Sequence, residues 1–95
     1  MITAIVERRF QPEKVEDIAR LLVELRRRMM QQSGYISGET LWSTNDPSLW
    51  VDVSTWTYSG QWKKWKAAPE HKEIQSEIES LLIASEKVSI FNIVR

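Results

Sequence analysis

Apolar and polar residues alternate at the start of the chain, and this period of two is typical of a β-strand. The apolar positions of this run are Ile2, Ala4, Val6 and Phe10. After Pro12, which suits the first turn of a helix because its missing N–H would have no partner there, the period changes to about 3.6. The pattern predicts a helix from Val15 to near Gln32, stopped by Gly34. The apolar stripe of this helix consists of Ile18, Leu22, Leu25 and Met29.

Two further β-rich runs, residues 35–43 and 49–57, flank the turn-forming segment 44–48 and are predicted to form a hairpin. Ser59 is placed to cap a short helix, and Pro69 begins a second helical piece. The short helix carries Trp62 and Trp65, and the second piece carries Ile74, Ile78, Leu81 and Leu82 on one face. Residues 88–94 are predicted to form a last strand.

The predicted order, β-α-β-β-α-β with a broken second helix, is the ferredoxin-like split βαβ arrangement of the α+β class. It places both helices on one face of a four-stranded antiparallel sheet and leaves the other face bare. A water-exposed face normally shows clean polar alternation, but Leu49, Val51 and Val53 share one parity of the third strand. We therefore expect a second copy to cover the bare face, so that the chain is a homodimer.

Length and charge exclude several classes of protein. A chain of 95 residues is expected to form a single domain, residues 1–95, with a small core. Its 13 basic and 13 acidic residues give no net charge, which argues against nucleic-acid or membrane binding. No cysteine and a single histidine argue against a disulfide framework and a conventional metal site. Since no signal peptide or membrane span is recognisable, we expect a cytoplasmic protein.

The single histidine, His71, is the first candidate for chemistry. It lies three and seven residues before Ile74 and Ile78, so all three share the sheet-facing side of a helix. One interpretation is a general base or hydrogen-bond donor in a pocket, since imidazole titrates near neutral pH. The alternative is a structural residue whose ring hydrogen-bonds a backbone carbonyl.

Tryptophan is concentrated between residues 42 and 65, where all five of the chain lie. The predicted topology brings the end of the third strand to the following helix, so Trp56, Trp62 and Trp65 are expected to form an aromatic wall near His71. Asp52, Ser54 and Tyr58 are the polar groups predicted to share this substrate pocket, because small-molecule sites combine apolar walls with a few polar groups. The alternative is that the indole rings simply fill a small core.

Several motifs, taken in order, resemble the antibiotic biosynthesis monooxygenase domain family. They are Pro12-Glu13-Lys14, Gly34-Tyr35, Asp46-Pro47 before the strand that ends in Trp56, Thr57-Tyr58-Ser59-Gly60-Gln61-Trp62, and Trp65-Lys66-Ala67-Ala68-Pro69-Glu70-His71. The resemblance implies a dimeric α+β barrel in which two sheets pack through their bare faces. Some members oxidise quinols or polycyclic phenols with O₂ and use no metal, flavin or haem.

The resemblance also assigns residues. His71 stands at the second histidine of the family's His-x-x-Ser-x-x-His pattern, and Trp56 matches its strand-end tryptophan. The chain departs from the pattern at Trp65, which replaces the first histidine, and at Ala68, which replaces the serine. Both departures remove polar groups from the expected pocket.

At Trp65 the chain resembles the haem-degrading relatives, which also have a tryptophan at this position. These relatives also need a haem-ligating histidine, where this chain has Ile74 and Gln75, and an asparagine on the first strand, where it has Glu7. The sequence therefore favours a cofactor-independent monooxygenase that acts on a small aromatic molecule with O₂. A non-catalytic or isomerase-like binder of a small metabolite is the alternative, and haem binding is a third.

Overall fold

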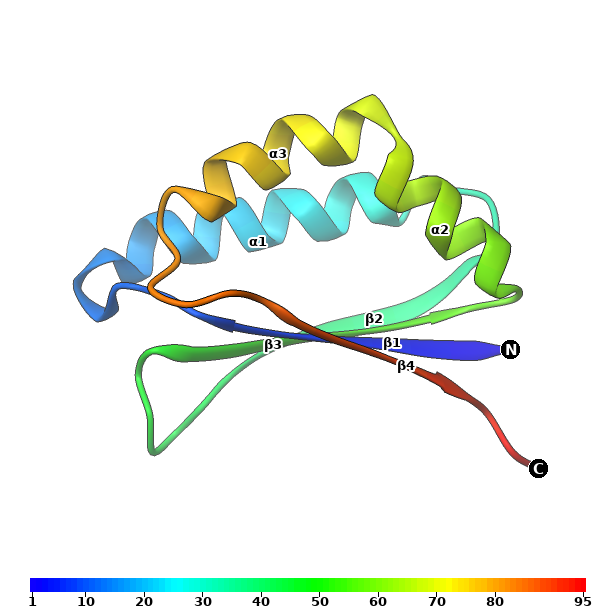
Figure 1. Ribbon diagram of the computed structural model, residues 1–95, viewed down its shortest axis with the longest axis horizontal. Coiled ribbons are helices and arrows are strands. Elements are labelled where there is room, and N and C mark those ends of the chain that lie inside the picture. The colour runs from blue at the N-terminus through cyan, green and yellow to red at the C-terminus, as the bar shows by residue number, and fades with distance from the viewer.

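The four strands form one antiparallel sheet, and the helices cover one of its faces in this computed structural model of residues 1–95 (Figure 1). The strands are β1 (Ile2–Arg9), β2 (Tyr35–Trp42), β3 (Leu49–Trp56) and β4 (Lys87–Asn92). The helices are α1 (Val15–Met29), α2 (Ser59–Ala67) and α3 (Pro69–Glu79), with the 3-10 turn η1 (Pro12–Lys14) before α1. The strand order β2-β3-β1-β4 confirms the predicted ferredoxin-like α+β fold.

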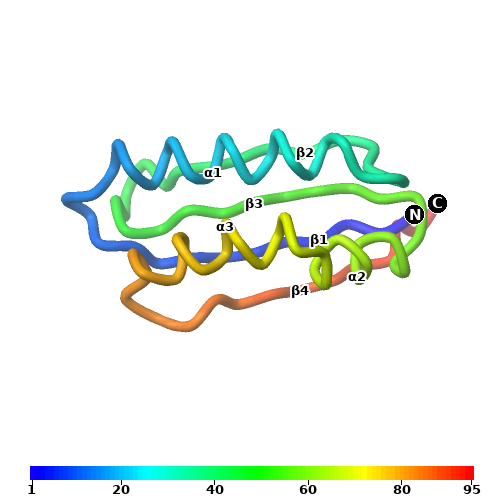
Figure 2. Tube along the Cα trace, turned by 90° about the horizontal axis from the view of Figure 1, so that it is seen from above, coloured from blue at the N-terminus to red at the C-terminus, as the bar shows by residue number.

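The register of the strands decides which side chains face the helices. Paired residues of antiparallel strands point to the same face, and β1 pairs with β3 so that Val6 lies opposite Asp52 and Ile5 opposite Val53. Every second residue of both strands is buried under the helices, whereas Ile5 and Val53 lie half-buried on the bare face. Leu41 of β2 is 46% exposed on that same face. Viewed from above, α1 lies over the β2 and β3 side of the sheet and α3 lies over β1 (Figure 2).

The core fills the space between the helices and the sheet. Its members are Ile2, Phe10, Ile18, Leu21, Leu22, Leu25, Met29, Trp50, Trp56, Trp65, Ile74 and Ile78. The predicted stripe of α1 is therefore buried, as the period of 3.6 indicates. The helix ends at Met29, three residues before the predicted end. No helix of the structure is both long and apolar enough to cross a lipid bilayer.

The second helical region is broken where proline requires it. Ala68 has an extended backbone (φ −70°, ψ 144°) that separates α2 from α3, because the residue before a proline avoids the helical region. The prediction that Ser59 caps α2 is wrong, since Ser59 is the first helical residue. The orphan N–H of Tyr58 is instead satisfied by the side chain of Gln61, whose Oε1 accepts its hydrogen bond at 3.1 Å.

Candidate functional site

Polar side chains interrupt the buried face of the sheet. Arg8 of β1 is only 3% exposed, and Asp52 and Ser54 of β3 are 8% and 5% exposed. Arg8 donates a hydrogen bond to Asp52 through Nη1 and a second one to Glu86 through Nε, at 2.6 Å. Gln75 of α3 donates to the same carboxylate of Glu86 at 2.9 Å. Because buried charges need partners, this network fixes the position of Arg8 between the sheet and the segment before β4.

His71 lies on the sheet-facing side of α3, as its spacing from Ile74 predicts, and is 4% exposed. Its ring meets the indole of Trp65 edge-on, with 5.0 Å between centroids and an interplanar angle of 76°. The Nδ1 atom is buried and has no hydrogen-bond partner. Burial, and then the positive charges of Lys66 and Arg8, lower the pKa of His71 from 6.5 to about 4. The charge of Glu86 and the backbone of Lys66 act in the opposite direction but are weaker, so the imidazole is neutral at pH 7.

These groups surround a small cavity, here called the chamber, between the sheet and helices α1, α2 and α3. Its lining consists of Val6, Arg8, Leu25, Met29, Asp52, Ser54, Trp62, Trp65, Lys66 and His71. Five of the seven residues predicted for the site are thus brought together: Asp52, Ser54, Trp62, Trp65 and His71. The cavity volume is about 20 Å³, which is roughly the space that one water molecule needs. The protein's own side chains, indoles included, therefore nearly fill the chamber.

The other two predicted site residues lie outside the chamber. Trp56 is completely buried in the core, where its Nε1 donates to Ser54 Oγ at 3.0 Å and its ring meets Tyr35 edge-on. It stands behind the chamber wall and positions Ser54. Tyr58 differs from the expectation more strongly, because it is 69% exposed at the start of α2 and does not line the cavity. A residue at a helix entry projects outward here, which spacing along the chain does not reveal.

Sequence reasoning misses five of the ten residues of the chamber. Val6 and Leu25 are recognised only as apolar positions of β1 and α1, and three residues with longer side chains are also missed. Arg8 could have been recognised from the sequence, because it is a charged residue at an inward-facing position of β1, between Val6 and Phe10. Lys66 follows Trp65 and resembles part of a solvated basic run, although it lines the chamber. The helical period indicates Met29 only as a core residue. These last three omissions share one cause, since long side chains reach a site that their position in the chain does not indicate.

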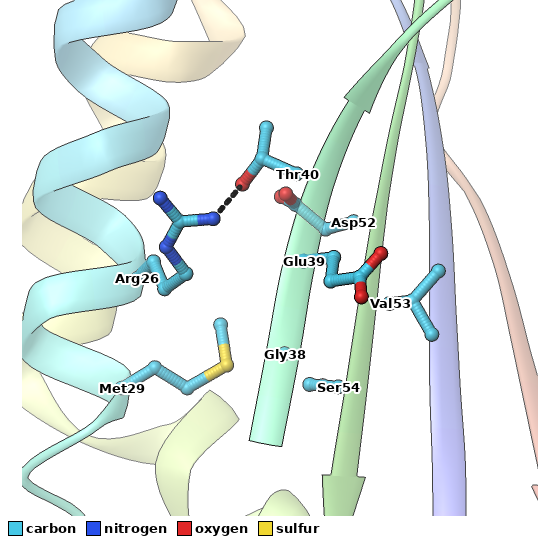
Figure 3. A pocket seen from close by; sticks show the side chains of 8 residues that line it. All are labelled: Arg26, Met29, Gly38, Glu39, Thr40, Asp52, Val53 and Ser54. Carbon is cyan, nitrogen blue, oxygen red and sulfur yellow. Dashed lines mark hydrogen bonds between the residues drawn. The ribbon is translucent and has the colours of Figure 1, made fainter.

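A second, smaller void adjoins the chamber on the side of β2 (Figure 3). Its volume is about 10 Å³, and it shares Met29, Asp52 and Ser54 with the chamber. The other lining residues are Arg26, Gly38, Glu39, Thr40 and Val53. Arg26 Nη1 donates to Thr40 Oγ1 at 3.4 Å across the gap between α1 and β2. Three residues therefore line both voids, and α1 is the helix that contributes to both.

The positions that would hold haem in the haem-degrading relatives carry unsuitable groups. Ile74 is fully buried in the core, and Gln75 is engaged with Glu86. Glu7 points to the bare face, with its carboxylate 3.8 Å from Lys87 Nζ, so the first-strand residues that reach the chamber are Val6 and Arg8. No residue near the chamber other than His71 has an imidazole, because the chain contains only one.

Similar solved structures share this architecture over nearly their whole length. A conserved protein from Methanosarcina mazei Go1 is 19% identical, with a TM-score of 0.89 over 96% of this chain and 90% of that one. An antibiotic biosynthesis monooxygenase is 17% identical, with a TM-score of 0.91 over the whole of both chains. SnoaB from Streptomyces nogalater, a cofactor-independent oxygenase solved in a mutant form, is 12% identical, with a TM-score of 0.87 over 99% of this chain and 93% of that one.

At these identities the structural likeness shows the fold, and family membership rests on the sequence. No curated protein matches the chain. The family model for antibiotic biosynthesis monooxygenases matches residues 1–77, which include β1 to β3 and every helix-borne residue of the chamber. The chain therefore belongs to the antibiotic biosynthesis monooxygenase family.

Proposed function

We propose that this protein is a cytoplasmic, cofactor-independent monooxygenase that oxidises a small phenol or quinol with O₂. The observation that carries the proposal is the buried, neutral His71, which lines an indole-walled chamber and has an unpaired Nδ1, in a chain of this family. A buried polar atom without a partner is costly in a native fold and is common at functional sites.

The chemistry requires no external reductant. The substrate hydroxyl passes its proton to His71 Nδ1, and the resulting phenolate gives one electron to O₂. The superoxide and phenoxyl radicals then join at an unsubstituted ring carbon ortho or para to the oxygen, which forms a peroxide. His71 returns its proton to the distal peroxide oxygen. Loss of the hydrogen on that carbon as a proton, with cleavage of the O–O bond, leaves a quinone carbonyl and one water. The ring supplies all four electrons, and each O₂ atom is accounted for.

The residues around His71 support this sequence of steps. His71 is neutral in the chamber, and the negative charge of a phenolate beside it would raise its low pKa and so favour transfer of the proton to the imidazole. The indoles of Trp62 and Trp65 offer flat apolar surfaces for an aromatic ring. Exclusion of water from such a site protects radical and peroxide intermediates from side reactions. Arg8 forms salt bridges with Asp52 and Glu86, so the three charges partly neutralise one another. They contribute to the electrostatic field at the chamber, and neither carboxylate is assigned the role of a base.

Substrate entry requires the chamber to enlarge, because small-molecule pockets commonly have volumes of about 300–1,000 Å³. Trp62 is the indole best placed to move. It is half-buried on the first turns of α2, whereas Trp65 is 2% exposed and packed against His71. Rotation of Trp62 away from the sheet would open the chamber toward the end of the molecule where α2 lies.

We further propose that the functional unit is a homodimer joined through the bare sheet faces. Ile5, Val51 and Val53 are half-buried there, and Leu41 is 46% exposed. A second sheet would remove this apolar surface from water. It would also hold β1 and β3 rigid beneath the chamber.

Oxygen consumption with a panel of quinols and phenols tests the proposed reaction. We expect uptake of O₂ and one ¹⁸O atom from ¹⁸O₂ in the product, with a loss of about 10²-fold or more in kcat for His71→Ala, the size typical of a general base. Lys72→Ala is the matched control, because Lys72 is the exposed next residue of α3. Oxidation that continues unchanged in His71→Ala would remove His71 from the mechanism.

The closed chamber also favours a second candidate, a non-catalytic or isomerase-like binder of a small metabolite. Trp65 and Ala68 provide no polar group where the family pattern has histidine and serine, and the cavity has room for about one water. Fold does not determine the reaction. Quenching of tryptophan fluorescence by a bound aromatic ligand, without any consumption of O₂, would identify this function instead.

A further inference from the structure

Two cations line the chamber, and only one of them has carboxylate partners. Arg8 contacts both Asp52 and Glu86 directly. Lys66 forms no salt bridge, and its Nζ lies over the ring of Trp62, 5.5 Å from the ring centroid. Lys66 is thus a cation at the chamber without a direct counter-ion.

The position of Lys66 on α2 explains this arrangement. Lys66 lies one helical turn after Trp62, which brings its ammonium over the Trp62 ring, and Lys66 also lines the chamber. It is half-buried, unlike the exposed Lys63 and Lys64 of the same helix. Burial is the main reason that the pKa of Lys66 is lowered. The ammonium has therefore lost part of its hydration, and the π-face of Trp62 is the group that it contacts directly.

The charges that face Lys66 leave room for an anion. The carboxylates of Glu86 and Glu79 attract it from a distance, and Arg8 repels it. Glu86 is already bound by Arg8 and Gln75, and its own pKa is lowered even though burial alone would raise it. An anionic oxygen that entered the chamber would find in Lys66 the one cation there not already paired.

We propose that the chamber selects an aromatic ligand that carries a carboxylate, with Lys66 binding the carboxylate while the ring lies against Trp62 and Trp65. This inference rests on the proposed function in one respect, because a hydroxyl on the same ring is the group that His71 would deprotonate. The substrate class is then a hydroxylated aromatic carboxylic acid. Lys66 is the residue that determines specificity, and His71 is the base.

Binding in the absence of O₂ tests the proposal separately from the reaction. Two matched pairs of probes differ only in charge: 4-hydroxybenzoate against 4-hydroxybenzamide, and 6-hydroxy-2-naphthoate against 6-hydroxy-2-naphthamide. By calorimetry we expect the acid of at least one pair to bind at least tenfold more tightly than its amide. Equal affinity within both pairs, or no binding of either acid, would overturn the proposal.

The variants identify the residue responsible. In Lys66→Gln we expect the preference for the acid to fall to about one while affinity for the amide stays unchanged, which also shows that the chamber is intact. Lys66→Arg should keep the preference, and Lys63→Gln, an exposed lysine one turn earlier, should leave it unaltered. A preference that survives in Lys66→Gln would assign the recognition to another group.

The outcomes separate this proposal from the proposed function. Selective binding of the acids without O₂ consumption would leave Lys66 as a recognition residue in a binding protein. Oxidation of neutral quinols at the same rate in wild type and Lys66→Gln, without selective binding of either acid, would support the oxygenase and reject the role of Lys66.

Discussion

A histidine that is buried in its neutral form makes the stability of this fold depend on pH. His71 has a pKa of about 4 in the folded chain and 6.5 as its ordinary value. Between these values the unfolded chain binds a proton that the folded chain does not, so unfolding is favoured as the pH falls. The stabilisation is fully present above about pH 6.5 and is lost progressively toward pH 4. From pH 7 to pH 5 we expect a loss of about 2 kcal/mol in the free energy of unfolding.

Denaturant unfolding at a fixed protein concentration measures this loss. Three carboxyls also have a lowered pKa: Glu24, Asp46 and Glu86. Their ordinary pKa values are near 4, so the stability that they provide is lost mainly below about pH 5. His71→Gln should therefore show a nearly flat free energy of unfolding between pH 7 and pH 5. In the wild type, an imidazole NMR resonance that titrates near pH 6.5 would contradict the argument directly.

At the same scale, the sequence predicts where a side chain points only if a regular period determines the direction. The spacing of His71 from Ile74 predicts its buried position correctly, because helical angle fixes the direction of a Cβ atom. Tyr58, by contrast, is exposed and does not line the chamber, since it lies at a helix entry where no periodicity determines direction. The near-closure of the chamber is beyond prediction, because volume depends on the rotamers of Trp62 and Trp65 and on how α2 packs.

At the scale of elements, two glycines provide a test of the connections. Gly34 has a φ of 87°, and a Cβ atom there would lie 1.8 Å from the Oε1 of Gln61, the atom that accepts the Tyr58 N–H. Gly34→Ala is expected to lower the free energy of unfolding by about 1–3 kcal/mol, since it adds backbone strain and displaces Gln61. A decrease of this size in the free energy of unfolding should appear as a lower urea concentration at the midpoint of unfolding.

Gly60 is the matched control, because it lies in the first turn of α2 and a Cβ atom added there would meet no other atom within 4 Å. Gly60→Ala is expected to leave stability unchanged or to raise it by about 0.5–1 kcal/mol, as alanine favours a helix. A Gly34→Ala variant as stable as Gly60→Ala would show that the turn before β2 can adjust freely.

The elements themselves are predictable for a physical reason. Strong periods of 2 and 3.6, together with Pro12, Gly34 and Pro69, mark their type and approximate limits. The cap of α2 is not predictable, because Ser59 and Gln61 both offer suitable side chains and only the backbone conformation of Tyr58 decides between them. The end of α1 at Met29 lies inside the usual uncertainty of helix limits.

At the scale of the whole molecule, the bare face of the sheet is an apolar surface that a partner subunit would cover. The apolar residues of this face lie on all four strands, with Phe91 of β4 among them, and those of β1 and β3 lie directly behind Arg8, Asp52 and Ser54. A small domain of this length buries only about 60–65% of its unfolded surface. Covering this face would therefore add stability to the same strands that position the chamber.

Val53→Asp tests this requirement, because Val53 lies opposite Ile5 near the middle of the bare face and beside Glu39 of β2. In a sheet-to-sheet dimer the new carboxylate would be buried without a partner, next to a like charge, so we expect the variant to be monomeric in light scattering. Val23→Asp, on the outer side of α1 where Val23 is 54% exposed, should remain dimeric. A wild-type monomer, or a dimer unaffected by Val53→Asp, would mean that another surface or no partner at all supports the chamber.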